Sequence, residues 1–211
     1  MQKIITEEML SVLRENVAHG LSHRRYEHTL AVEEMVTLLA EIYCPEKTLD
    51  LRAAALLHDI TKEYDYKVQT AMLSKPGIEF NKEEKLAPKT FHARTAALLI
   101  HEIYPEFSDD DVISAIRWHT TGRAGMSLTE KLLYLADYID SSRTFPDCIK
   151  LRDYFFSKDV KKMEESERME HLNRTLLMSF DMTIRALIDG GNIISKDTIN
   201  ARNDILCEIN G

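Results

Sequence analysis

The chain has 211 residues, of which 44% are hydrophobic and 29% are charged, and its formal net charge at pH 7 is −8. This length fits one domain with a sizeable core, and the acidic balance argues against nucleic acid or an anionic membrane as a partner, since both require a basic face. No apolar run approaches the roughly 18 residues of a membrane-spanning helix. The segment MQKIITEEML has an acidic pair where a signal peptide is apolar. We therefore expect a cytoplasmic protein that does not associate with membranes.

The three cysteines, Cys44, Cys148 and Cys207, are an odd number and show no CxxC spacing. Neither a disulfide framework nor a thiolate zinc site is indicated. We expect them to be reduced and mostly structural.

Helical periodicity dominates the chain, and no convincing stretch shows the alternation typical of strands. A first helix is predicted after Thr6 as its N-cap, and it ends near Gly20. In the second helix His28 shares the apolar face, so that its side chain is expected to point inward, before Pro45 stops the segment. A third helix, from about 50 to 58, is apolar on nearly every side and is predicted to be buried.

The pattern weakens between Lys62 and Lys89, where only a short helix around 68–73 and a break at Pro76-Gly77 stand out. Such a segment is the best candidate for a mobile flap.

Stronger signals return at His92, where a helix is predicted to start and to run up to Pro105. The pairs Ser108/Asp111 and Ser127/Glu130 are each interpreted as capping boxes that open the next two helices. The second of these helices carries Asp137 within LLYLADYI.

Residues 158–170 are charged and predict the solvated opening of a long helix, whose buried stripe runs from Leu172 to Ile188 and which ends at Gly190-Gly191. A terminal helix is predicted from about 197 to 209. With no repeat or linker to divide the chain, we expect one all-α domain over residues 1–211, with a core at about 20–145 and C-terminal helices at 147–211 packed on it.

Six polar residues stand at intervals of about one helix plus its connection. Imidazole nitrogen and carboxylate oxygen suit iron, manganese or zinc. An acid at the end of a buried, alanine-rich helix, as at position 59, is costly without a cation, and the acid within LADYI repeats that argument. The sequence therefore favours a hydrolytic metal site formed by His28, His58, Asp59, His92, His119 and Asp137.

Other interpretations of the same residues stay open. A single core histidine is more often hydrogen-bonded structure than a ligand. Asp137 could pair with an arginine such as Arg117, and His119 could be a cation at a helix end. The remaining histidines, which stand beside charged or loop residues, are assigned to the surface: His19, His23, His101 and His171.

The pattern of His28, His58-Asp59 and Asp137 resembles the HD-domain metal-dependent phosphohydrolases, and HDITK at 58–62 matches their form HDxxK. More specific is HTTGRAGMS at 119–127, followed by EKLLYLADYID and by SRTFP at 142–146. This block is similar to the symmetrical diadenosine tetraphosphate hydrolases (YqeK type), and the resemblance runs from about residue 24 to residue 203. One departure is Ala93, where that family more usually has glycine.

The resemblance also argues against two other HD activities. Ile-Thr-Lys after His58-Asp59 lacks the Glu-Asp pattern of alarmone hydrolysis, and no GYP sequence follows His119, which argues against cyclic dinucleotide cleavage.

The resemblance implies a single HD-domain helical bundle that cleaves diadenosine tetraphosphate into two ADP with one or two iron ions, or with manganese or another divalent metal. His28, His58, Asp59 and Asp137 would hold the first ion. A second would be held by His92 and His119 with Asp59 bridging; with one ion only, these histidines would donate hydrogen bonds to phosphate. The implied catalytic residues are Asp59 and Lys62, and the implied substrate-binding residues are Arg25, Lys62, His92, His119, Thr120 and Arg143.

Two competing functions remain at this point: hydrolysis of another nucleotide, and nucleotide sensing through an occupied but slow metal site. The solvated-lysine interpretation of Lys62 also stays open. A homodimer is compatible with the apolar YLADYI helix, and the segment GNIIS from Gly190 is a candidate cover for the adenine.

Overall fold

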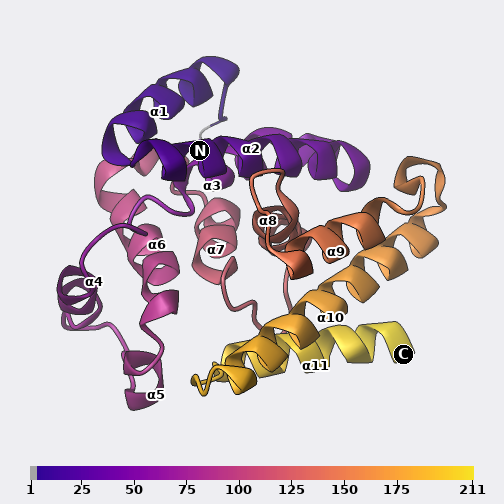
Figure 1. Ribbon diagram of the computed structural model, residues 1–211. Helices are drawn as coiled ribbons and strands as arrows, with labels where there is room; N and C mark the ends of the chain where they lie inside the picture. Colours follow the sequence, from indigo (N-terminus) through magenta and orange to yellow (C-terminus); the bar gives the residue numbers. More distant parts are fainter. Residues whose placement is uncertain (1–3) are drawn as a thin grey trace.

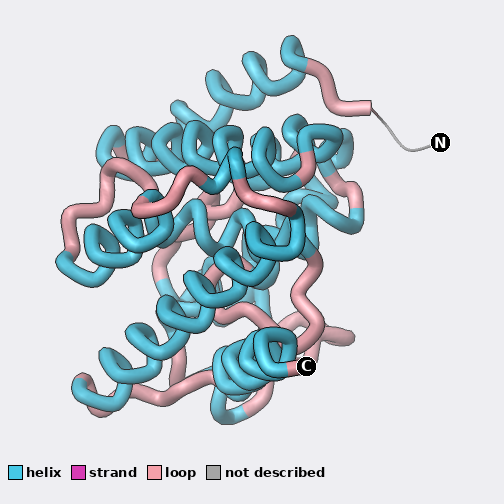
Figure 2. Tube along the Cα trace, turned by 90° about the vertical axis from the view of Figure 1, so that its right-hand side faces the viewer, coloured by secondary structure: helices cyan, strands magenta, loops and turns pink. Residues whose placement is uncertain are grey.

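The computed structural model describes residues 4–211. Within that range every regular element is helical, and Figure 2 shows helices joined by loops with no strand, which confirms the expected all-α class. The α-helices, labelled in Figure 1, are α1 (Glu7–Gly20), α2 (His23–Tyr43), α3 (Thr48–Leu57), α4 (Tyr66–Leu73), α5 (Lys82–Lys85), α6 (Phe91–Ile103), α7 (Asp110–Trp118), α8 (Leu128–Ile139), α9 (Pro146–Phe156), α10 (Glu165–Asp189) and α11 (Lys196–Asn210). Short 3-10 helices are η1 (Pro45–Lys47), η2 (Pro88–Thr90), η3 (Pro105–Phe107) and η4 (Val160–Lys162).

Side-chain caps begin several of these helices where the sequence predicts them. Thr6 caps α1 by accepting from the backbone N–H of Met9 at 3.2 Å. The capping box of Ser127 and Glu130 at α8 is present in both directions. These caps satisfy N–H groups that no carbonyl of the helix can reach.

The capping box predicted from Ser108 and Asp111 is wrong. Asp109 is the N-cap of α7, and its carboxylate accepts from the Asp111 N–H at 3.0 Å. The Ser108 hydroxyl instead donates to the carbonyl of Pro105. A carboxylate at the N-terminus of a helix also gains from the helix dipole, which favours Asp109 over its neutral neighbour.

Two further elements refine the expectations. The weakly patterned segment contains α5, which a capping box of Asn81 and Glu84 supports. The helix α9 starts at Pro146, one residue before the C-terminal helices were expected to begin.

A continuous hydrophobic cluster extends along the chain from Ile5 to Ile205. Helix α2 packs against α3 and α8, and α7 packs against α3, α6 and α8. Figure 1 shows α2 running across the upper part of the view, with α1 above it and with α7 and α8 below it. The antiparallel pair of α10 and α11 packs on this bundle through α8 and α9.

Gly122 lets the connection after α7 pass close to α10 and α11. Its φ is +63°, and a Cβ built there would lie 2.7 Å from Cζ of Phe180 and 2.9 Å from Cβ of Ala201. Only glycine meets both conditions without strain. The close approach fixes the segment that follows His119.

Burial corrects two expectations about apolar faces. The YLADYI segment lies inside the bundle, with Leu135 and Ala136 fully buried, so it cannot serve as a dimer interface. The stripe of α10 is buried only as far as Phe180, whereas Ile188 is 60% exposed, because the end of α10 projects beyond the helices that cover its first half. No helix among residues 4–211 is long and apolar enough to cross a membrane.

Candidate metal centre

The six predicted ligands come from five helices that meet inside the bundle. His28 lies on α2, and His58 and Asp59 follow the last turn of α3. His92 is in the first turn of α6, and His119 is the C-cap of α7. Asp137 is in the last turns of α8. The structure brings all six side chains together.

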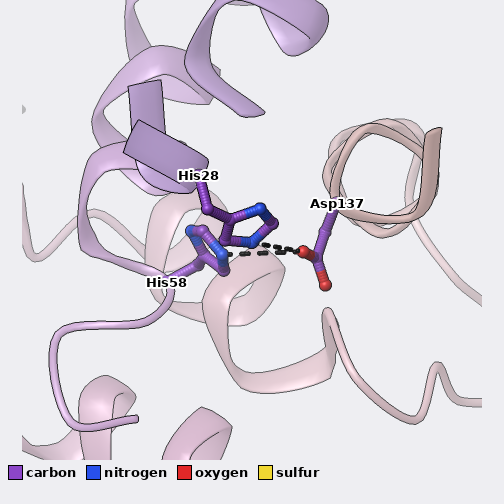
Figure 3. A group of neighbouring side chains, drawn as sticks. All are labelled: His28, His58 and Asp137. Carbon is purple, nitrogen blue, oxygen red and sulfur yellow. Dashed lines mark ion pairs between the residues drawn. The ribbon is translucent and has the colours of Figure 1, made fainter. Parts of the chain in front are cut away.

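The first part of the site is formed by His28, His58 and Asp137, which Figure 3 shows pointing toward one another. Asp59 lies beside them. Oδ1 of Asp137 lies 3.0 Å from Nε2 of His28 and 3.8 Å from Nε2 of His58. Oδ2 of Asp59 lies 3.8 Å and 3.5 Å from the same two nitrogens. Two nitrogens and two oxygens therefore surround one point.

The second part of the site lies at the other oxygen of Asp59. Its Oδ1 is 3.3 Å from Nε2 of His92 and 3.7 Å from Nε2 of His119. The two imidazole nitrogens are 3.1 Å apart. Asp59 thus places one oxygen in each part of the site, and its Oδ1 faces both His92 and His119.

Backbone carbonyls orient two of the rings. Nδ1 of His58 lies 2.6 Å from the Ala55 carbonyl, and Nδ1 of His119 lies 2.7 Å from the Ile116 carbonyl. Each Nδ1 must therefore carry the proton it donates, which leaves the Nε2 lone pair facing the site. This tautomer is the one a metal ligand needs.

Several buried atoms at this point have no hydrogen-bond partner among the described residues. They are Nε2 of His28, Nε2 of His58 and Oδ1 of Asp59. Buried polar atoms are normally satisfied, because an unsatisfied one costs about 1–3 kcal/mol. A divalent cation would satisfy all three, and the nitrogen and oxygen donors fit such an ion.

Both acids are held ionised. Burial disfavours the Asp59 carboxylate, but its interactions with His58 and with the Lys62 ammonium outweigh burial and hold its pKa well below the usual range. Burial also disfavours the Asp137 carboxylate, but Arg143 and the neighbouring His28 hold its pKa well below the usual range. The carboxylates are therefore ready to bind a cation.

The histidines divide into two groups. Burial disfavours the imidazolium of His28, but the carboxylates of Asp137 and Asp140 beside the ring outweigh burial and raise its pKa to about 9. Burial lowers the pKa of His92 far below its usual value and also lowers that of His119. His119 does lie at the end of α7, but burial favours its neutral ring over a helix-end cation.

Two arginines contact the acids of the site. Nη1 of Arg25 donates to Oδ2 of Asp59 at 2.7 Å, and Nη2 of Arg143 donates to Oδ1 of Asp137 at 2.5 Å. The partner of Asp137 is thus Arg143 and not Arg117. Each guanidinium keeps further donors, and Nε of Arg25 is buried without a partner among the described residues.

Lys62 and Thr120 lie beside His92. Nζ of Lys62 is 3.0 Å from Nε2 of His92 and 3.9 Å from Oδ1 of Asp59, and its side chain is two-thirds buried. It is therefore not an ordinary solvated lysine. Burial lowers its pKa even though Asp59 opposes the shift. Oγ1 of Thr120 is 3.1 Å from the same nitrogen of His92.

Sequence reasoning missed Asp140 and Ser142. Nδ1 of His28 faces Oγ of Ser142 at 3.2 Å and Oδ2 of Asp140 at 3.5 Å, and Ser142 donates to Asp140. Both residues therefore orient His28. An acid at the end of the apolar YLADYID segment was the available signal, since Asp140 is fully buried.

One of the four histidines assigned to the surface is not there. His19, His23 and His101 are exposed, but His171 is 3% exposed. Its Nε2 donates to the carbonyl of Phe155, and its ring stacks on that of Phe155. The charged residues before it in sequence lie on the solvent side of α10, so composition alone gave the wrong prediction.

Comparisons with known proteins agree with this geometry. Residues 25–142 match the HD domain, a range that includes all six residues of the site. The chain is 33% identical over 192 residues to the "Bis(5'-nucleosyl)-tetraphosphatase, symmetrical" of Halalkalibacterium halodurans, covering 89% of this chain and 92% of the relative. The Staphylococcus aureus protein of the same name is 34% identical, covering 87% of each chain. That of Bacillus subtilis is 28% identical, covering 93% of this chain and 95% of the relative.

A crystal structure from Clostridium acetobutylicum, described as a "predicted HD superfamily hydrolase involved in NAD metabolism", has the same fold. It superposes with a TM-score of 0.80 at 33% identity, covering 94% of this chain and 97% of the other.

Proposed function

Because the chain belongs to the HD-domain family, and within it to the symmetrical bis(5'-nucleosyl)-tetraphosphatases, we propose that it hydrolyses diadenosine tetraphosphate at the central bridge to give two ADP. The observation that carries this proposal is the buried set of imidazoles and carboxylates around the two oxygens of Asp59. The proposal includes a single domain over the whole chain and a cytoplasmic location.

We propose iron as the cofactor, with manganese or another divalent metal able to replace it. His28, His58, Asp59 and Asp137 would hold one ion, and His92 and His119 would hold a second with Asp59 bridging. When bound, the metal supplies Lewis acidity at the phosphoryl group and lowers the pKa of water toward neutrality.

The cations of the site would neutralise the polyphosphate. Arg25 and Arg143 have donors left after binding the two acids, and guanidinium pairs with phosphate in a forked geometry. The Thr120 hydroxyl and, where only one metal binds, the rings of His92 and His119 would complete the contacts with phosphate oxygens.

Lys62 would act on the leaving group. Its ammonium lies beside His92 and within 3.9 Å of Asp59, and its lowered pKa makes it a readier proton donor to the departing ADP oxygen. In the same position its charge offsets the charge that develops on that oxygen.

The test is anion-exchange separation of the products after iron- or manganese-loaded protein meets diadenosine tetraphosphate, with a chelator control. We expect ADP as the sole early product and no product with chelator. ATP together with AMP would mean that a different bond is cut. Binding of the nucleotide without turnover would favour a sensor, and turnover only of other nucleotides would favour another phosphohydrolase.

The oligomeric state is a separate part of the proposal. A homodimer remains our expectation, but the buried YLADYI helix does not support it. Sedimentation equilibrium of the metal-loaded protein tests it, since a monomer at all concentrations contradicts the dimer.

A further inference from the structure

A cavity of about 150 Å³ lies on the side of the site that His92 and His119 occupy. Its walls come from the segment around α5 and η2, from the end of α7 and from the connection between α10 and α11. Thr90, two residues before His92, and Thr121, two residues after His119, both line it. Figure 1 shows α5 and the turn between α10 and α11 at the same end of the molecule. The cavity therefore lies beside the two segments that carry His92 and His119.

Arg117 is the unusual residue of this cavity. It is half-buried and its guanidinium stacks 4.0 Å from the ring of Trp118, but it makes no hydrogen bond or ion pair with any residue in the range 4–211. The other arginine in the wall, Arg94, is held by Glu84 and by the carbonyl of Glu79. A partly buried guanidinium with unused donors indicates an anionic ligand, and its forked geometry suits phosphate.

The remaining walls suit a nucleoside better than a bare polyphosphate. Three cations, Arg94, Arg117 and Lys196, face three acids, Glu83, Glu84 and Asp197, so the wall is close to neutral. A ligand with one phosphate at Arg117 and otherwise neutral polar groups fits this balance.

The hydroxyl protons of Thr90 and Thr121 are already donated to the carbonyls of Ala87 and Gly122. Their oxygens therefore remain acceptors, as ribose hydroxyls or a base amino group require. Ile193, which is 43% exposed at the wall, offers an apolar surface to a base.

We propose that this cavity binds the second nucleotide of the substrate, with Arg117 pairing to the phosphate next to its nucleoside. The inference rests on the proposed function, because a substrate cut at its centre has two equal halves that must lie on either side of the scissile bond. Arg25 and Arg143 lie on the side of His28 and Asp137, and the cavity lies on the other side. Arg117 is thus a substrate-positioning residue for the second half.

The first experiment uses ADP, which is one half of the substrate, as the probe. Titration calorimetry of the metal-loaded protein should give two ADP per chain, and Arg117→Gln should give one. Arg117→Lys keeps the positive charge but cannot pair with phosphate through two hydrogen bonds at once, so it should weaken the affinity for the second ADP by about tenfold. Arg168→Gln is the matched control, since Arg168 is also half-buried and stacks on an aromatic ring, that of Tyr43, away from the cavity.

Trp118 gives a second readout, because it is the only tryptophan of the chain and contacts Arg117. Its fluorescence should change as the second ADP binds to the wild type and to Arg168→Gln, and should stay constant in Arg117→Gln. The KM for diadenosine tetraphosphate should rise about tenfold or more in Arg117→Gln with little change in kcat. Circular dichroism checks that the variant is folded; if it is not, Arg117→Lys carries the test.

The outcomes separate the two proposals. A wild type that binds one ADP, or a folded Arg117→Gln that binds two with unchanged affinity and hydrolyses the substrate with unchanged KM, overturns the role of the cavity and leaves the function intact. A wild type that produces no ADP overturns the function, and with it the assignment of the cavity to a second half-substrate, even where ADP binding depends on Arg117.

Discussion

Asp59 is the residue on which both parts of the site depend. Its Oδ2 faces His28 and His58, and its Oδ1 faces His92 and His119. Asp59→Asn removes the charge with almost no change in shape. We expect tightly bound metal to be lost and kcat to fall by about a hundredfold or more, because the amide is a poor ligand and cannot balance the cation. Metal content by mass spectrometry and hydrolysis rates are the measurements.

A matched control for this substitution is Asp153→Asn, which makes the same change at an exposed position. It should retain metal and activity. An Asp59→Asn protein that holds wild-type amounts of metal would contradict the assignment of the ligands.

Asp140 acts one step further from the metal. It lies beside Nδ1 of His28 and is itself held by Ser142. Partners of this kind set the orientation and basicity of a ligating ring, and their loss typically costs 10–100-fold in metal affinity. We therefore expect Asp140→Asn to bind metal about tenfold more weakly, as measured by competition with a chelating dye. Unchanged affinity would show that Asp140 serves only to cap the end of α8.

At the residue scale the sequence predicts which side chains gather at the site better than it predicts their partners. The six histidines and acids that the sequence singles out lie together in the structure, because each stands at the end or on the buried face of a well-marked helix. The pairing of Arg143 with Asp137, the role of Asp140 and the burial of His171 depend on which helices pack together. No local pattern carries that information.

At the scale of elements, the connection between α7 and α8 positions His119 through Gly122. A side chain at 122 would meet both Phe180 and Ala201 at under 3 Å and would require a positive φ. We expect Gly122→Ala to lower the free energy of unfolding by about 2–5 kcal/mol, the sum of the backbone strain and the overpacking. Chemical denaturation followed by circular dichroism measures this.

Gly125→Ala separates the two contributions. Gly125 has a φ of +65° but nothing within 4 Å of its virtual Cβ, so only the strain of about 1–2 kcal/mol applies. Equal losses in the two variants would mean that the contact with α10 and α11 is not rigid.

Helices with strong apolar runs and clear caps are the elements that the sequence predicts well. Thr6 and the pair Ser127/Glu130 mark two helix starts correctly because their caps are local interactions. The error at Ser108 arises because either of two adjacent residues can cap the same helix. The prediction for the end of α10 is wrong because an apolar stripe does not show how far the neighbouring helices extend to bury it.

At the scale of the whole molecule, the negative charge of the buried carboxylates is balanced by cations of the same protein. His28 with its raised pKa, together with Arg25 and Arg143, offsets the carboxylates of Asp59 and Asp137. A bound metal would take over part of this role, since it binds His28 only in its neutral form. Protons and metal therefore compete for the same ring.

The sign of the resulting pH dependence follows from the pKa of His28, which is about 9 in the folded, metal-free protein and about 6.5 in an unfolded chain. A raised pKa contributes stability that is fully present below pH 6.5 and is lost as the pH rises through 9. The Tm of the chelator-treated protein should therefore decrease as the pH rises from 6.5 to 9. Metal binding should strengthen over the same range, because fewer protons compete for His28. The difference in Tm between the metal-loaded and the metal-free protein should therefore widen. In His28→Gln, the decline of the metal-free protein over this window should be smaller. Scanning calorimetry from pH 6 to 9 tests this, and a difference in Tm that narrows toward pH 9 would show that His28 is not a ligand in competition with protons.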